Sequence, residues 1–127
     1  SGLIADVGTI GWACLDEREA AYDRLELSQG PHSGVRIYKA SESSVAPESL
    51  GQPVLLSYLD CVVQGFHDVF GEDGVLDFFR STSGWDTPIL NDRTQPIYPR
   101  AQVLSADETA LVDSHIELVG ASVVKPT

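Results

Sequence analysis

Residues 15–24 hold the densest group of chemically useful side chains in the chain. Asp16 and Glu19 are three positions apart, and Tyr22 and Arg24 follow them. A carboxylate in a partly desolvated pocket can take a proton from one group and return it to another. The spacing of Asp16 and Glu19 is also that of a capping box, in which Asp16 caps a short helix and Glu19 bonds to its first backbone groups.

This segment resembles a pattern of the gamma-glutamylcyclotransferase-like family, which reads Leu-Asp-x-x-Glu and continues with an aromatic residue and an Arg that opens the next strand. The uncharged stretch with Trp12 that precedes it is also similar to that family. So is the Leu-Ser-Tyr-Leu sequence at 56–59, where members often carry Ser-x-Tyr-Leu, together with the later Gly65. The resemblance covers roughly residues 7–85, and the Tyr-Gly-Ser-type strand with which members begin has no counterpart before Gly11.

The resemblance implies that Glu19 is the catalytic carboxylate and that Tyr22 belongs to the binding site. In the family's reaction, the alpha-amino group of a small gamma-glutamyl compound attacks its own side-chain amide carbonyl and releases 5-oxoproline and a free amine. An active Glu19 needs a concave pocket and backbone N–H donors for the developing oxyanion. With the Tyr-Gly-Ser strand lacking, these donors would come from residues 7–11 or from another subunit; otherwise the activity has been lost.

A second group of candidate binding residues lies at 84–100 and comprises Trp85, Arg93, Tyr98 and Arg100. Arg binds carboxylates through two parallel hydrogen bonds and aromatic rings supply rigid contact area, so such a loop suits ligand or partner binding. In the enzyme interpretation, Arg93 or Arg100 clamps a substrate carboxylate. The structural alternative is a proline-rich segment wrapped over the helices, with Arg93 and its neighbour Asp92 capping or pairing locally.

The charge of the chain supports a function of a different class. Nineteen acidic residues face eight basic ones, which gives a net charge of −11. We therefore expect no nucleic-acid or membrane binding, since phosphates require a basic surface. A non-catalytic acidic protein that binds a basic protein partner is the alternative function, and a homo-oligomer is open in both interpretations. No motif for a metal or cofactor occurs, so we expect neither.

The elements that must position these residues indicate an α+β fold in a single domain over residues 1–127. A strand is expected within 7–14, a short helix at 15–22, and two half-buried strands at 24–27 and 35–38 around a turn. This mixed β/α part ends near residue 39, and an exposed polar loop follows at 40–52. The small sheet of the first third is expected to pack against helices from the rest.

Residues 53–127 are expected to be mainly helical. An apolar stripe predicts a helix from Pro53 to Phe70 that ends at Gly71, with Leu59 and Val62 in the centre of the core. A short helix follows at 72–80, then an irregular stretch at 84–100, and a last helix opened by the capping box of Ser105 and Glu108.

The two cysteines, Cys14 and Cys61, lie in apolar surroundings and form no CxxC motif. We interpret them as buried reduced thiols, with a single disulfide as the alternative. The first six residues lack the basic and apolar regions of a signal peptide. Together these features predict a cytoplasmic protein.

Overall fold

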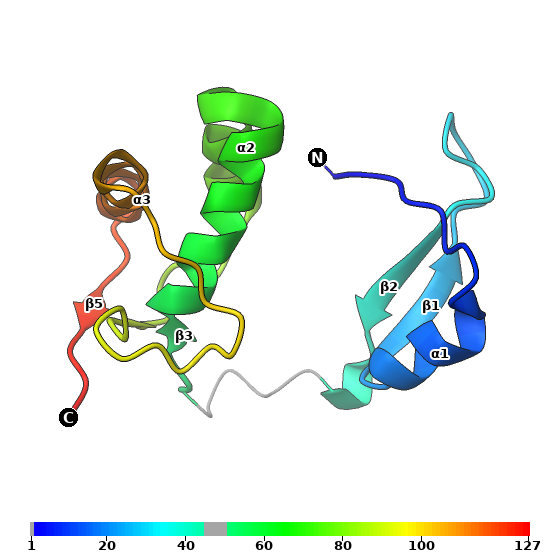
Figure 1. Ribbon diagram of the computed structural model, residues 1–127, viewed down its shortest axis with the longest axis horizontal. Helices are drawn as coiled ribbons and strands as arrows, with labels where there is room; N and C mark the ends of the chain where they lie inside the picture. The colour runs from blue at the N-terminus through cyan, green and yellow to red at the C-terminus, as the bar shows by residue number, and fades with distance from the viewer. Residues whose placement is uncertain (1, 45–50) are drawn as a thin grey trace. The chain divides into compact units, whose positions relative to one another are not determined.

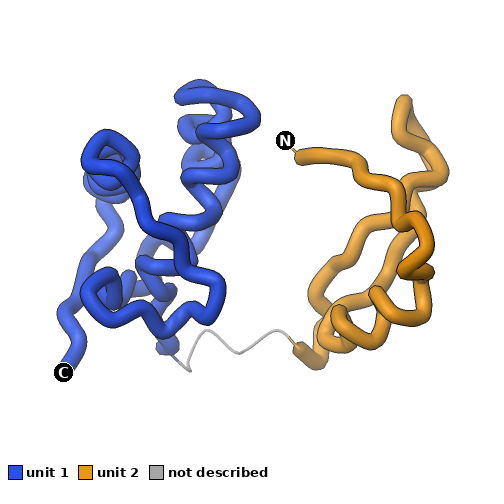
Figure 2. Tube along the Cα trace, viewed as in Figure 1, with its two compact units in different colours: residues 1, 51–127 blue, residues 2–50 orange. Residues whose placement is uncertain are grey.

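The computed structural model describes residues 2–44 and 51–127, which divide into two compact units. Unit 2 spans Gly2–Leu50 and unit 1 spans Gly51–Thr127, as Figure 2 shows in different colours. Each unit contains helices and strands of its own, so the predicted α+β class is confirmed. That all 127 residues make one domain stays a prediction. Of the predicted polar loop at 40–52, positions 45–50 lie outside the described residues.

Unit 2 consists of a short helix laid over a two-stranded sheet (Figure 1). Its elements are helix α1 (Gly11–Arg18), strands β1 (Tyr22–Glu26) and β2 (Arg36–Ala40), and the 3₁₀ turn η1 (Glu42–Ser44). β1 and β2 pair antiparallel, with Arg24 opposite Tyr38 and Leu25 opposite Ile37. The two predicted strands and the turn between them are thereby confirmed, but the strands are exposed rather than half-buried, with only Tyr38 partly covered.

The start of unit 2 differs from the sequence prediction. Residues 11–14 are helical rather than part of a strand, because Gly11 takes a positive φ of 76° and turns the chain directly into α1. The expected helix at 15–22 ends four residues early at Arg18, since Tyr22 already pairs with Ala40 in the sheet. Both cysteines are free thiols, but neither is buried as predicted: Cys14 is exposed and Cys61 is partly covered.

Unit 1 is built around helices α2 (Leu56–Ser81) and α3 (Ala106–Leu118). α2 is interrupted at Gly71, whose φ of 69° and ψ of −165° are not helical, so the predicted end of one helix and start of the next are confirmed. The capping box of α3 is confirmed as well. Glu108 donates its backbone N–H to Ser105 Oγ at 3.1 Å, and Ser105 donates its own to Glu108 Oε2 at 2.7 Å.

A second sheet, which the sequence did not predict, lies in unit 1. Strands β3 (Val54–Leu55), β4 (Ile89–Leu90) and β5 (Val123–Val124) run parallel in the order β3-β4-β5 (Figure 1). The helix predicted from Pro53 therefore begins only at Leu56, because the two residues before it belong to β3. The stretch at 84–100 is otherwise irregular, as expected.

The buried core of the described chain lies in unit 1. Leu59 is buried, as predicted, whereas Val62 is only partly covered. The core comes from α2, β4 and α3, and its buried apolar members are Leu56, Leu59, Val63, Val75, Phe79, Ile89, Val112 and Ile116.

None of the helices in the described part of the chain has the length and apolar character needed to cross a bilayer.

Candidate functional site

Glu19 lies at the junction between α1 and β1. Its backbone N–H donates to the Leu15 carbonyl at 2.9 Å and closes the helix, and its carbonyl accepts from Tyr22 N at 2.9 Å where β1 begins. The Glu19 side chain is 30% exposed and accepts a hydrogen bond of 3.2 Å from Nε of Arg18, which is 64% exposed. Such an ion pair at the surface contributes little to stability and costs little to open. The Glu19 carboxylate therefore remains accessible to a ligand.

The capping interpretation of Asp16 and Glu19 is wrong. A capping box needs both residues at the start of a helix, but α1 begins at Gly11 and Glu19 follows its last residue. At this end of the helix the dipole is negative, which makes a carboxylate there unfavourable by about 0.3 to 1 kcal/mol. The Glu19 side chain therefore lacks the structural role that its spacing suggested.

Asp16 has a different role, because it ties α1 to the sheet below. The hydroxyl of Tyr38 on β2 donates to Asp16 Oδ1 at 2.6 Å, and Arg24 on β1 approaches Asp16 Oδ2 at 3.5 Å. The Arg24 guanidinium also lies 4.5 Å from the centre of the Trp12 ring on α1. These contacts hold the helix, and with it Glu19, on the face of the sheet that carries Arg24 and Tyr38.

Tyr38 remains a proton donor in this network. Burial and the hydrogen bond to the negatively charged Asp16 raise the pKa of Tyr38 above its ordinary value, so the phenol stays protonated at neutral pH. The sequence did not single out Tyr38, because a contact between residues 22 positions apart leaves no local pattern. Its place opposite Arg24 in the strand register becomes visible only once β1 and β2 are paired.

The backbone of residues 7–11 cannot supply oxyanion donors to Glu19, contrary to one of the two sources expected from the sequence. α1 separates the two sites, and eight residues of helix at 1.5 Å each amount to about 12 Å. The backbone N–H groups of Ala20 and Ala21 follow Glu19 directly instead. Neither donates to a backbone carbonyl in the described part of the chain.

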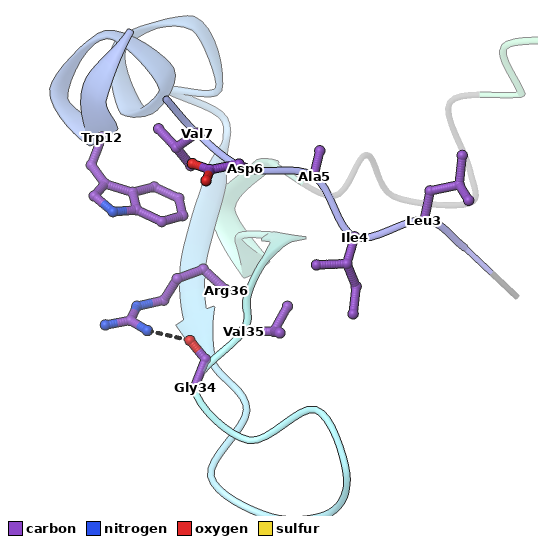
Figure 3. A pocket seen from close by; sticks show the side chains of 9 residues that line it. All are labelled: Leu3, Ile4, Ala5, Asp6, Val7, Trp12, Gly34, Val35 and Arg36. Carbon is purple, nitrogen blue, oxygen red and sulfur yellow. Dashed lines mark hydrogen bonds between the residues drawn. The ribbon is translucent and has the colours of Figure 1, made fainter. Parts of the chain in front are cut away.

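Unit 2 also contains a hollow of about 340 Å³, shown in Figure 3. Arg36 faces it, but its guanidinium already donates to the Gly34 carbonyl at 2.6 Å and contacts Glu26 at 3.1 Å. Glu19 is not among its lining residues, so this hollow is not the pocket that an active Glu19 requires. The residues that line it are Leu3, Ile4, Ala5, Asp6, Val7, Trp12, Gly34, Val35 and Arg36.

Tyr22, the other candidate from this segment, is exposed and is the first residue of β1, three residues after Glu19.

The candidates from residues 84–100 lie in unit 1. Trp85 stacks on Phe79 with 4.9 Å between ring centres and donates its indole N–H to the Phe79 carbonyl at 3.1 Å. Tyr98 packs edge-on against Tyr58, and Arg100 is exposed. Trp85 thus has a packing role.

Arg93 is held by two carboxylates of unit 1. Its guanidinium makes two hydrogen bonds of 2.8 Å to Asp60, which is buried, and one of 2.7 Å to Asp113. The hydrogen bonds to Asp60 raise the pKa of Arg93 despite its burial, and Asp113 adds to the rise. Arg93 therefore has a structural pairing role, but its partners lie 33 and 20 positions away in the sequence, so the expected local pairing is wrong. A role as substrate clamp, which stays a prediction, would require these bonds to open.

Asp92, beside Arg93, is a buried residue that the sequence analysis named only as one that caps or pairs locally. Its carboxylate accepts hydrogen bonds from the backbone N–H and hydroxyl of Ser57, at 2.8 and 2.6 Å, and from Ile97 N at 2.8 Å. Ser57 lies in the first turn of α2, whose preceding residue offers no capping side chain. Asp92 therefore caps α2 from a distant part of the chain.

The chemistry that these groups offer is proton transfer by a carboxylate. In the described residues, no three His, Cys, Asp or Glu side chains gather in a way that could hold a metal ion. Unit 2 brings together Glu19, the backbone N–H groups after it and the Asp16–Tyr38 pair. No family model, curated protein or solved structure matches this chain.

Proposed function

We propose that this chain is a gamma-glutamylcyclotransferase-like enzyme that converts a small gamma-glutamyl compound into 5-oxoproline and a free amine. The observation that carries the proposal is the position of Glu19, a partly buried carboxylate at the unfavourable end of α1. Residues whose type destabilises the helix or strand that carries them are expected at functional sites. The order of helix, Glu, aromatic residue and Arg-bearing strand also agrees with the resemblance of residues 15–24.

In the proposed reaction Glu19 takes a proton from the alpha-ammonium group of the gamma-glutamyl unit. The freed amine attacks the side-chain amide carbonyl, and the attacking nitrogen then gives up its second proton. The amide C–N bond breaks, and both protons end on the departing amine, one of them returned by Glu19, so that it leaves as an ammonium ion. No electrons are gained or lost, so no redox partner is needed. The backbone N–H groups of Ala20 and Ala21 support this scheme as donors to the oxyanion that forms on the carbonyl oxygen.

The experiment is an incubation of the full chain with several gamma-glutamyl amines, followed by measurement of 5-oxoproline. We expect Glu19→Gln to lower the rate at least about 100-fold, the usual contribution of a general acid and base. The matched control is Glu17→Gln, which removes an exposed carboxylate from the same helix and should leave the rate unchanged.

Stability separates a catalytic from a structural Glu19. Because the carboxylate faces the negative end of the helix dipole, Glu19→Gln should leave the melting temperature unchanged or slightly raised. No 5-oxoproline from the folded wild-type chain would refute the enzyme. Turnover that survives in Glu19→Gln would refute the role of this residue.

The second candidate function is that of an acidic protein that binds a basic protein partner. It is favoured by the net charge of −11. The affinity for a lysine-rich peptide, measured by titration calorimetry, should then fall steeply as the salt concentration rises. Binding that does not respond to salt would contradict this candidate.

A further inference from the structure

The arginines of unit 2 differ in how far their guanidinium groups are already bound. Arg18 donates a hydrogen bond to Glu19 at 3.2 Å, and Arg36 donates one to the Gly34 carbonyl at 2.6 Å. The guanidinium of Arg24 carries five N–H donors, and within the described stretches 2–44 and 51–127 it has an ion-pair contact of 3.5 Å but no side-chain hydrogen bond. The described chain therefore does not satisfy the donors of Arg24.

Contacts with α1 nevertheless hold the Arg24 guanidinium in one place. It lies 4.5 Å from the centre of the Trp12 ring, and the ion-pair contact of 3.5 Å is to Asp16 Oδ2. The other oxygen of Asp16 accepts the hydroxyl of Tyr38 at 2.6 Å, which fixes the carboxylate in turn. A planar guanidinium that is positioned before a ligand arrives loses less entropy when it binds one. Arg24 is thus prepared for a planar anion such as a carboxylate.

The same contacts place Arg24 beside Glu19. Asp16 and Glu19 are three positions apart at the end of α1, and side chains with this spacing are neighbours on one face of a helix. The guanidinium that approaches Asp16 is therefore close to the Glu19 carboxylate as well. Tyr38 gives further support, because the charge of Arg24 lowers its pKa and the charge of Glu19 raises it, so both act on the same phenol.

A carboxylate next to a guanidinium matches the free end of a gamma-glutamyl unit, which carries an ammonium group and a carboxylate on one carbon. We propose that Arg24 binds the alpha-carboxylate of the substrate through paired hydrogen bonds and thereby holds the alpha-ammonium group at Glu19. The identity of this substrate rests on the proposed function. Arg24 would then determine specificity, since a compound whose alpha-carboxylate is blocked leaves its donors without a partner.

The first test needs no turnover, because the product 5-oxoproline keeps the alpha-carboxylate. The full chain is titrated with 5-oxoproline while NMR follows the indole N–H signals of the two tryptophans. Trp12 lies under Arg24 and its signal should shift, whereas Trp85 packs on Phe79 in unit 1 and its signal should stay in place. 5-Oxoprolinamide, which lacks the carboxylate, should bind at least about 10-fold more weakly.

The matched variants are Arg24→Lys and Arg36→Lys. Both keep the positive charge, but lysine lacks the planar pair of N–H donors that binds both oxygens of a carboxylate. Arg24→Lys should weaken 5-oxoproline binding at least about 10-fold, and Arg36→Lys should bind it like the wild type. A Trp12 signal that does not respond to 5-oxoproline, or that responds equally in wild type and Arg24→Lys, overturns the proposal.

The second test is the release of 5-oxoproline from a gamma-glutamyl amine and from the same compound with its alpha-carboxylate converted to an amide. Wild type should prefer the carboxylate compound at least about 10-fold in kcat/KM, and Arg24→Lys should lose this preference through a higher KM. If Arg24 only holds α1 in place, the variant loses activity toward both compounds equally, which overturns its role but leaves the enzyme. A chain that releases no 5-oxoproline, yet binds it through Arg24 in the first test, refutes the enzyme and supports the carboxylate site.

Discussion

Replacement of Asp92 by Ala should destabilise unit 1 by about 3 kcal/mol, because it leaves buried donors without a partner. Asp92 is 1% exposed and Ser57 is 3% exposed, so the backbone N–H and the hydroxyl of Ser57 have no direct access to water. Each unsatisfied buried donor costs about 1 to 3 kcal/mol. The third donor, Ile97 N, belongs to a residue that is 60% exposed and can turn to water, so it adds little.

The assay is urea unfolding at pH 7 followed by far-UV circular dichroism, which reports mainly on α2 and α3. Asp86→Ala is the matched control, since it removes an exposed carboxylate from the loop on the other side of β4 and should change stability by no more than about 0.5 kcal/mol. A loss below about 1 kcal/mol in Asp92→Ala would refute the argument that this carboxylate caps α2.

The same carboxylate should make the stability of unit 1 depend on pH. Burial on its own raises the pKa of Asp92, but the hydrogen bonds from Ser57 and Ile97 outweigh it and hold the pKa below its ordinary value. A carboxyl whose pKa is lower in the folded state stabilises the fold above its unfolded pKa, about 3.9, and this contribution disappears as the pH falls through the folded pKa. The advantage of wild type over Asp92→Asn should therefore shrink below pH 4 in urea titrations, and an advantage that is constant down to pH 2 would contradict this.

Three other predictions concern the stability of the protein. Leu59→Ala should lower the free energy of unfolding by about 2 to 4 kcal/mol, because Leu59 is 3% exposed, whereas Val62→Ala should cost less because Val62 is only partly covered. Ser105→Ala should cost about 1 kcal/mol by removing the capping bond to Glu108, as seen in urea unfolding. Added salt should raise the melting temperature at pH 7 in calorimetry, and a flat response would mean that the acidic residues are already compensated.

The helices of unit 1 were predictable because their signals are local. The Ser105 and Glu108 pair marks the start of α3 by itself, and Gly71 interrupts α2 because its positive φ is a conformation that other residues avoid. The β3-β4-β5 sheet was not predictable, since each strand contributes only two residues and pairs with partners far along the chain. Strands this short carry no alternation that a sequence can display.

The role of Glu19 in the candidate site could not be predicted from the local sequence either. The spacing of Asp16 and Glu19 is the same whether the pair opens a helix or closes it, and only the position of the helix start decides between the two. The helix begins at Gly11, about one turn before the start at residue 15 that was predicted with Asp16 as its cap. The shift carries Glu19 from the end of a helix that favours a carboxylate to the end that opposes it. The stability of α1 therefore does not require Glu19, which is why we propose that this residue transfers protons.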